Sequence, residues 1–361
     1  MTASNLKGNI TSTKTGYCFI SIVLSFYNEE KVLHALIERL RKTLGNLRQD
    51  RTISGYELIF VNDASTDISE VILKEASVGH DDIRIVTMSR NFGVTECVFA
   101  GLEYSVGDAV IYMDADLQDP PEVIPSMIDA WKNGDRVDVV HTVRQSRAGE
   151  SRIKMFITKI GYKILHNLTD IKLPIEVGDF KLLSRRAVNH LLQLKEHKPF
   201  IRGLVCWIGF KQVFVPYHRD PRFSGETKFH IFDKRVLWNF FESALISFSS
   251  VPLKGMVILG GVISIVAFIM LIYVVIQKFI LPDVTQGWST IMATMLLIGG
   301  IQLLSLGIIG IYLNIVFMEV KGRPRHIIKE VFGFSSDKME STPVDQKNKT
   351  ISTPITNSHE K

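Results

Sequence analysis

Cysteine is scarce in this sequence, and its few copies are widely spaced. The 361 residues include 3 cysteines, Cys18, Cys97 and Cys206, and no two of them have CxxC spacing. A small, odd number of scattered cysteines excludes a disulfide framework and a structural zinc site of the finger type. It favours a reducing compartment such as the cytoplasm.

Several motifs that mark common ligand sites are also missing. The sequence contains neither GxGxxG nor GxxxxGK[ST], and none of its 10 histidines has HExxH spacing. These absences leave no basis for a dinucleotide site, a P-loop or a catalytic zinc site. Because no zinc-finger, homeodomain or RNA-recognition pattern occurs, we expect no nucleic acid among the partners.

A signal peptide is absent from the N-terminus, whereas apolar residues are abundant near the C-terminus. Residues 1–15 are polar and contain no apolar run of signal-peptide length, so we expect a disordered tail and no cleaved targeting signal. Hydrophobic residues make up 46% of the chain, and their excess lies between Gly255 and Phe317. This concentration predicts a membrane segment.

Strands and helices alternate over the first part of the chain. Short apolar runs predict strands at 19–25, 56–61, 83–88, 109–113 and 137–143. Helical periodicity or a proline start predicts helices at 29–47, 67–76, 94–104 and 121–131. Helices between short, fully apolar strands predict an α/β fold with a mostly parallel sheet covered on both faces.

Polar residues follow each of the five predicted strands. They stand at 27–29, 62–63, 89–91, 114–116 and 144. In open α/β sheets, ligands bind beyond the carboxyl ends of the strands. A single polar group after a strand is typical of an ordinary turn, but five such groups together predict a ligand-binding crevice.

The stretch after the fourth strand carries a pair of carboxylates. Asp114 and Asp116 lie two residues apart, and Gln118 adds an amide oxygen. Such oxygens suit a divalent cation, Mg²⁺ or Mn²⁺, which would neutralise a diphosphate leaving group. The alternative is that Asp116 or Asp119 caps the helix that starts at Pro121, and both roles can hold.

Two long apolar runs predict membrane helices. Residues 255–277 and 291–317 contain no charged side chain, and each run is long enough to cross a bilayer at ~1.5 Å per residue. Basic residues flank the pair on both sides, but the loop 278–290 contains only Lys278. The positive-inside rule therefore predicts a multi-pass protein of the cell inner (plasma) membrane, with the catalytic domain and both termini in the cytoplasm.

Further segments complete the predicted domain organisation. The soluble domain spans residues 16–230, and 253–320 hold the two membrane helices. Residues 231–252 have an aromatic-rich face and are predicted to lie in the membrane interface, although a packed surface helix is the alternative. Residues 321–361 read as a basic and then disordered cytoplasmic tail.

The combined motifs resemble a known enzyme family. The matching stretches are 21–30, 60–67, 89–93, 114–121, 177–182, 202–210 and 222–229. Together they resemble family 2 glycosyltransferases of the polyprenyl-phosphate type, which include dolichol-phosphate mannosyltransferases and bactoprenol glucosyltransferases. The resemblance implies a Rossmann-like domain of the glycosyltransferase A type that binds a nucleotide-sugar.

The resemblance also implies roles for individual residues. The implied donor ligands are Tyr27, Glu29, Asn62, Asp63, Asp114, Ala115, Arg144, Arg222 and Lys228. The implied metal ligands are Asp114, Asp116 and Gln118, and the implied catalytic residues are Asp114, Asp116 and Asp179. Arg147, Arg152 and Arg202 would hold the acceptor phosphate. Attraction to lipid headgroups is the alternative for the first two arginines.

Two positions depart from the family pattern, and one role stays open. Asn62 stands where the family usually has Asp, and Ser25 stands where it usually has Pro. These departures leave open whether Asn62 or Asp63 contacts the nucleoside. Asp179 occupies the position of a general base, but a polyprenyl phosphate is already ionised near neutral pH. Orienting Arg202 or the sugar hydroxyls is therefore the alternative for Asp179.

The implied reaction moves a hexose, glucose, from UDP-glucose to undecaprenyl phosphate with inversion. Its product would be a lipid-linked sugar for cell-envelope glycan modification of the O-antigen kind. Transfer of mannose or an aminosugar is the alternative within this enzyme class. The absence of a Gln-x-x-Arg-Trp motif disfavours a processive polysaccharide synthase, and the intact Asp114, Asp116 and Gln118 disfavour an inactive membrane scaffold. Related enzymes form tetramers, so we expect a homo-oligomer.

Overall fold

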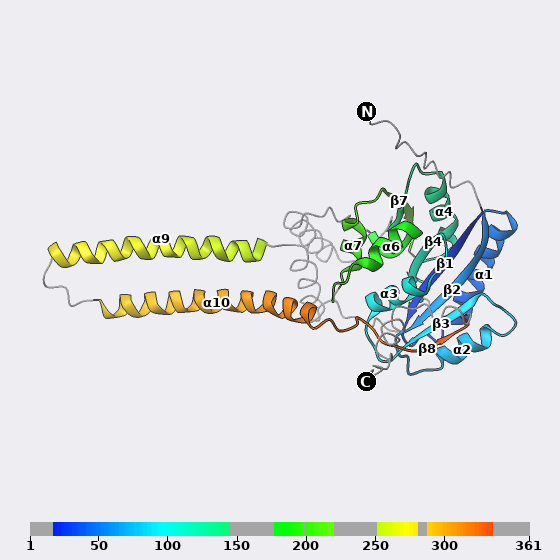
Figure 1. The fold of residues 1–361 in the computed structure, drawn as a ribbon, viewed down its shortest axis with the longest axis horizontal. Helices are drawn as coiled ribbons and strands as arrows, with labels where there is room; N and C mark the ends of the chain where they lie inside the picture. The colour runs from blue at the N-terminus through cyan, green and yellow to red at the C-terminus, as the bar shows by residue number, and fades with distance from the viewer. Residues whose placement is uncertain (1–16, 145–176, 198, 220–250, 281–286, 335–361) are drawn as a thin grey trace, which may run out of the picture.

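The computed structural model of the protein describes residues 17–144, 177–197, 199–219, 251–280 and 287–334. These residues form an α/β domain and two long helices that extend away from it (Figure 1). All statements below concern this part of the chain.

An eight-stranded mixed sheet lies at the centre of the α/β domain. Its strand order is β7-β5-β6-β4-β1-β2-β3-β8. The strands are β1 (Cys18–Phe26), β2 (Ile53–Asn62), β3 (Ile83–Met88), β4 (Ala109–Asp114), β5 (Val139–Arg144), β6 (Val177–Ser184), β7 (Gln212–Tyr217) and β8 (Ile328–Phe332). Only β6 and β8 run antiparallel to their neighbours. The carboxyl ends of the other strands therefore share one edge with the start of β6.

Helices cover both faces of this sheet. On one face lie α1 (Leu33–Gln49), α2 (Ser69–Ala76) and α4 (Ile124–Asn133), the last preceded by the 3-10 turn η1 (Pro121–Val123). On the other face lie α3 (Val94–Tyr104), α6 (Arg185–Gln193) and α7 (Ile201–Trp207). The α/β class and the sheet covered on both faces, predicted from the sequence, are confirmed.

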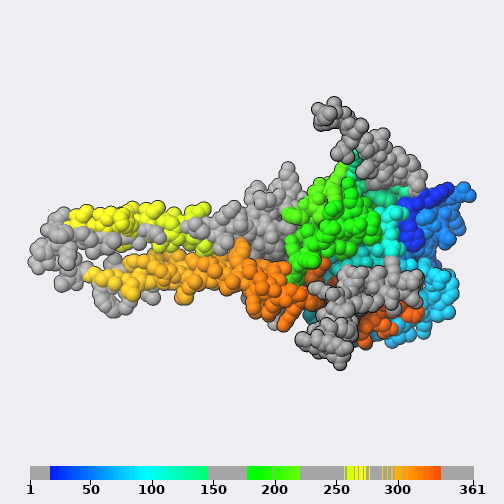
Figure 2. All heavy atoms as spheres, viewed as in Figure 1, coloured from blue at the N-terminus to red at the C-terminus, as the bar shows by residue number. Residues whose placement is uncertain are grey.

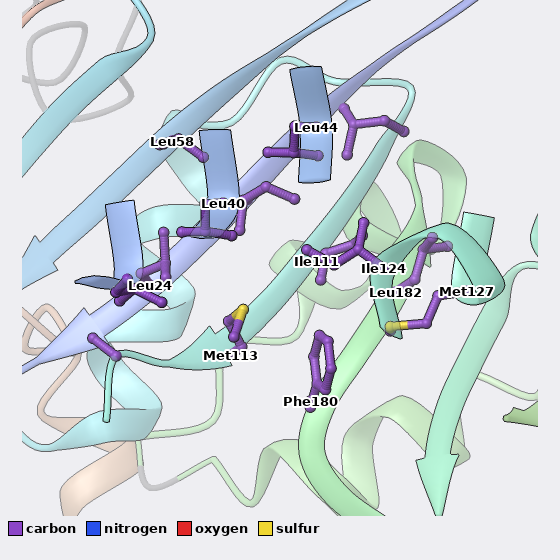
Figure 3. Close-up of a cluster of buried hydrophobic side chains, with 14 of the residues drawn as sticks. Leu24, Leu40, Leu44, Leu58, Ile111, Met113, Ile124, Met127, Phe180 and Leu182 are labelled. Atoms are coloured by element: carbon purple, nitrogen blue, oxygen red, sulfur yellow. The ribbon is translucent and has the colours of Figure 1, made fainter. Parts of the chain in front are cut away.

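The apolar periodicity of α1 explains how this helix packs. Leu36, Leu40 and Leu44 recur at helical spacing, and each is fully buried. Figure 3 shows Leu40 and Leu44 directed toward the sheet, close to Leu24 and Leu58. Burying such side chains contributes about 1.5–3 kcal/mol each. The strands that end at the candidate site are therefore packed against a buried apolar layer.

Three strands were not predicted, and each has a physical reason. β6 contains Asp179 and Lys181, so it lacks the continuous apolar run of the other central strands. The burial pattern of β7 is irregular. β8 is only 5 residues long and follows a basic stretch. The local sequence of β6, β7 and β8 therefore gives no clear strand pattern. These strands form because they pair with strands that are distant in the sequence.

Two long helices occupy the positions of the predicted membrane spans. They are α9 (Val251–Ile280) and α10 (Trp288–Val320), and they run side by side away from the α/β domain (Figures 1 and 2). Within α10, Leu297–Val320 is long and apolar enough to cross a membrane, and none of its most apolar window is buried in the protein. In α9 the described apolar stretch, Ile258–Met270, is shorter. Crossing by both helices stays a prediction.

The chain returns to the α/β domain after α10. β8 pairs antiparallel with β3, and the Ser89 amide donates a hydrogen bond to the Ile327 carbonyl at 2.9 Å. The Arg325 guanidinium lies 4.2 Å from the centre of the Phe99 ring of α3. The first part of the segment predicted as a basic and then disordered tail therefore completes the sheet, and residues 335–361, for which disorder was predicted, lie outside the described residues. The predicted interfacial helix lies almost wholly outside the described residues.

Candidate active site

The candidate site lies where the order of the strands reverses, between β1 and β4. The register places Ser25 of β1 beside Asp114 of β4, and the Ser25 hydroxyl donates to Asp114 Oδ1 at 3.3 Å. The chain continues from β1 to β2 on one side, whereas β4 lies on the other. Crevices at such switch points are the usual ligand sites of open α/β sheets.

A tight turn follows β4 and carries the carboxylate pair. Leu117 adopts a φ of 58°, and the Gln118 amide donates to Asp116 Oδ1 at 3.1 Å. A left-handed conformation at a non-glycine residue costs about 1–3 kcal/mol and is common at functional sites. The N-cap of the following turn η1 is Pro120, with no side-chain hydrogen bond. The described hydrogen bonds of Asp116 and Asp119 go to the Gln118 amide and the Tyr217 hydroxyl.

Asp114 lies in a region of concentrated negative charge. Burial, followed by the charges of Asp179, Asp116 and Asp119, raises the pKa of Asp114 to about 7. Carboxylates that share a site repel one another in their ionised forms, and a cation placed among them removes this cost. The turn after β4 therefore has the electrostatics of a cation site.

The donor set fits a divalent ion that is shared with a ligand. Within the residues that the structure describes, no group of three or more His, Cys, Asp or Glu side chains is arranged to hold a metal. Mg²⁺, however, commonly takes one or two carboxylates and completes its shell with water and substrate phosphates. Asp114 and Asp116, with the Gln118 amide oxygen, match this requirement and do not form a closed protein cage.

Because β6 runs in the opposite direction, its beginning brings Asp179 to the same edge. Arg202 of α7 donates through Nε to Asp179 Oδ1 at 2.6 Å and through Nη2 to the second oxygen. Burial opposes ionisation of Asp179, but this paired contact, together with Lys181 and Arg144, outweighs it and lowers the pKa to about 2. Asp179 is therefore an ionised, hydrogen-bonded carboxylate and a weak base near neutral pH.

The two predicted donor ligands at the end of β2, Asn62 and Asp63, are both buried. The Asp63 carboxylate accepts hydrogen bonds from the backbone amides of Phe92 and Gly93 at 2.7 and 2.9 Å. Asn62 accepts from the Ser65 amide at 2.8 Å and donates to Glu70 at 2.9 Å. Both side chains hold loops of the site, and Asn62 is only 1% exposed.

The loops after β1 and β2 are joined to each other by side-chain hydrogen bonds. Asn28, with a φ of 54°, accepts from the Thr66 amide at 2.8 Å, and the Glu29 amide donates to the Ser69 hydroxyl at 3.0 Å. Tyr27, the preceding residue, is 37% exposed. Part of this predicted nucleoside ligand is therefore accessible to solvent.

Arg144, at the end of β5, reaches the same edge. Its Nε donates to the Tyr217 hydroxyl at 3.3 Å, and its Nη2 would lie 3.3 Å from a Cβ on Gly178. A side chain at position 178 would therefore crowd this guanidinium. The other predicted phosphate ligands, Arg147, Arg152, Arg222 and Lys228, lie outside the described residues.

Three polar residues near the site were not predicted as functional. Asp119 accepts a hydrogen bond from the Tyr217 hydroxyl at 2.5 Å. Lys181 is completely buried, and its Nζ has no hydrogen-bond partner among the described residues. Burial lowers the pKa of Lys181 to about 8. Asp119 stood in the carboxylate motif, but no sequence signal marked Tyr217 or singled out Lys181.

This arrangement defines a class of protein. An α/β sheet with a strand-order reversal, a carboxylate pair after β4 and basic side chains at the same edge is typical of a nucleotide-sugar-binding domain of the glycosyltransferase A type. Residues 21–192 match the family model Glycosyl transferase family 2. The chain belongs to glycosyltransferase family 2, in the group that includes the bactoprenol glucosyl transferases, and it is therefore a glycosyltransferase.

Its relatives match it over most of their length. An uncharacterized glycosyltransferase of Synechocystis sp. is 40% identical over 91% of this chain and 99% of its own. A prophage bactoprenol glucosyl transferase homolog of Escherichia coli is 33% identical over 86% of this chain and 99% of its own. The solved mannosyltransferase of Pyrobaculum calidifontis, in complex with GDP-Man and Mn²⁺, is 17% identical over 56% of each chain, with a TM-score of 0.40.

Proposed function

We propose that this glycosyltransferase moves glucose from UDP-glucose to undecaprenyl phosphate, with inversion, at the cytoplasmic face of a membrane. The observation that carries the proposal is the gathering of Asp114, Asp116, Arg144 and the Asp179–Arg202 pair at one edge of the sheet. Opposite charges side by side suit a reaction in which one diphosphate departs and one phosphate attacks. The names of the bactoprenol glucosyl transferase relatives support this acceptor and this sugar.

The long apolar helices support a lipid-borne acceptor. Exposed apolar side chains run along α10, including Leu303 at 72% and Leu313 at 64% exposure. Such a surface is costly in water and favourable in lipid. We infer that α9 and α10 both cross the bilayer, that their connecting loop lies outside, and that they keep the catalytic domain at the depth of the lipid phosphates.

The chain's own residues account for the binding of the donor. Tyr27 and Glu29 at the rim contact the nucleoside, while Arg144 meets the oxygens of the diphosphate, for which a guanidinium fork is well suited. Arg222 and Lys228 follow β7 in the sequence and add positive charge to this group. A divalent ion held by Asp114, Asp116 and Gln118 would offset the charge that the leaving diphosphate gains.

The acceptor needs little activation in this scheme. A phosphate oxygen of the lipid attacks the anomeric carbon from the face opposite the diphosphate, so the new C–O bond forms as the old one breaks. Because the pKa of Asp179 is about 2, this carboxylate is a poor proton acceptor. We assign it the role of holding Arg202, whose guanidinium steers the acceptor phosphate, with Arg147 and Arg152 as further cations.

Transfer into an organic-soluble product tests the proposal. The full chain, in vesicles that contain undecaprenyl phosphate, is given labelled UDP-glucose with Mg²⁺ or Mn²⁺. Label should enter the organic phase, chelator should abolish the transfer, and Asp116→Ala should lose it while remaining membrane-bound. The exposed Asp81→Asn is the matched control with normal transfer.

Each other outcome has a defined meaning. If label is transferred from GDP-mannose or a UDP-aminosugar but not from UDP-glucose, the proposed donor is wrong and the proposed class of reaction stands. Absence of transfer from every donor would favour an inactive membrane scaffold. Retention of the donor's anomeric configuration in the product, determined by NMR, would refute the single displacement.

A further inference from the structure

Among the described residues, no carboxylate holds Arg144 directly, although Asp119 and Asp179 lie nearby. Its Nε donates to the Tyr217 hydroxyl, which in turn donates to Asp119 Oδ1. The hydroxyl hydrogen points to Asp119, so the hydroxyl oxygen is left to accept from Arg144. The three groups form a directed chain from guanidinium to phenol to carboxylate.

Within this series of hydrogen bonds, the two partners of Arg144, Tyr217 and Asp119, are held in place by burial. Asp119 is 1% exposed and Tyr217 is 3% exposed. Tyr217 lies opposite Arg144 in the β5–β7 register, and its ring packs edge-on against Phe180 at 6.0 Å. Buried polar groups of this kind lose rotamer freedom and hold their partners in place. Burial and the neighbouring Asp119 raise the pKa of Tyr217 to about 12, so the phenol keeps its hydrogen.

These hydrogen bonds use the Nε hydrogen of Arg144 and do not involve its two Nη groups. In the described part of the structure, the Nε hydrogen is the one committed to protein, which leaves the Nη hydrogens for a ligand. A direct carboxylate partner would instead form a closed, bidentate pair, as Arg202 does with Asp179. A neutral phenol therefore orients the guanidinium without neutralising it.

We propose that Asp119 and Tyr217 are positioning residues that aim Arg144 at the diphosphate of the nucleotide-sugar donor. The inference rests on the proposed function, because it takes the diphosphate as the ligand of Arg144. Asp119 thus has a different task from Asp114 and Asp116, although all three stand in one motif. It anchors the end of the β5–β7 pair to the turn that carries the carboxylates, and it contacts no substrate.

The affinity of the full chain for UDP and for uridine, measured in detergent micelles, tests this role. Tyr217→Phe should weaken UDP binding by about three- to tenfold, the value of one oriented hydrogen bond, and should leave uridine binding unchanged. Asp119→Ala should do the same, whereas Asp119→Asn, which keeps an acceptor for the phenol, should recover most of the affinity. GDP and guanosine serve as the second pair of probes.

A double-mutant cycle separates positioning from simple packing. If Tyr217 acts through Arg144, then Tyr217→Phe should add little to the loss caused by Arg144→Gln. The matched control is Tyr56→Phe, since Tyr56 lies beside Asp82 and Arg41 at the opposite end of the sheet. This substitution removes a tyrosine hydroxyl that likewise lies beside an aspartate and an arginine, and it should not change UDP affinity.

The possible failures are distinguishable. If the unaltered protein binds neither UDP nor GDP, the proposed function fails and this inference fails with it. If Arg144→Gln weakens UDP binding but Tyr217→Phe does not, only the positioning role is overturned. Fully additive losses of UDP affinity, or an equal loss of uridine affinity, would show that Tyr217 merely supports the fold.

Discussion

Asp114→Asn is expected to make the metal-free protein more stable while abolishing transfer. Asp114 has a pKa of about 7, against an ordinary value of 3.8, because of burial and three neighbouring carboxylates. A carboxyl whose pKa is raised by folding stabilises the fold at low pH, and this contribution is lost as pH rises through the folded-state pKa. Above about pH 7, the ionised Asp114 therefore weakens the fold, and a neutral amide should relieve this.

The size of the effect follows from the difference in pKa. At roughly 1.4 kcal/mol for each tenfold change in proton affinity, full shielding from water would give about 4 kcal/mol at pH 8. Asp114 is only partly buried, so solvent screening reduces the expectation to about 2–3 kcal/mol. For a chain of this size, that corresponds to a rise in Tm of about 4–10 °C.

Thermal unfolding with chelator present measures this difference. The variant should exceed the unaltered protein in Tm at pH 8 and should match it below about pH 3, where Asp114 is protonated in both the folded and the unfolded chain. Added Mn²⁺ should raise the Tm of the unaltered protein more than that of the variant. Asp81→Asn, an exposed aspartate, is the control that should not change Tm. Equal or lower stability of Asp114→Asn at pH 8 would refute the assignment of repulsion at this turn.

Three further expectations concern the neighbourhood of the site and the end of the chain. Lys181→Met should stabilise the fold by about 1–3 kcal/mol at pH 7, because it removes a buried ammonium without a hydrogen-bond acceptor in the described structure, and the gain should shrink toward pH 10. Arg202→Ala should lower transfer at least about tenfold and create a new acidic limb in its pH profile, since Asp179 loses the partner that keeps its pKa low. A chain that stops after Val320 should unfold at lower temperature than one that stops after Phe334, because only the latter keeps β8; equal Tm values would contradict this.

The sequence predicted those elements whose apolar residues follow the periodicity of a strand or a helix, because the same residues are buried in the structure. The apolar runs of the central strands and the helical stripe of α1 predicted where these elements begin and end, in most cases to within a few residues. The carboxylate motif was recognisable because Asp114 and Asp116 follow a buried strand directly. In each case the information lies in neighbouring residues, which is what periodicity can detect.

Features that depend on distant pairing could not be predicted in the same way. β6 and β8 take their direction from β4 and β3, and neither has a strong strand pattern of its own. The roles of Asp63 and Asn62 as supports for loops follow from hydrogen bonds to residues of other loops. The bridge from Tyr217 to Asp119 joins residues that lie far apart in the sequence. Only the folded arrangement brings these partners together.

The late position of β8 sets an order of events during synthesis. Val331 pairs with Val86, so one edge strand of the sheet is synthesised only after both long helices. Non-local strand pairing of this kind forms slowly and leaves an open sheet edge until its partner arrives. Closure of the enzyme's sheet is thereby delayed until the two long helices have been made. A chain cut short before β8 would carry a catalytic domain whose sheet is open at β3.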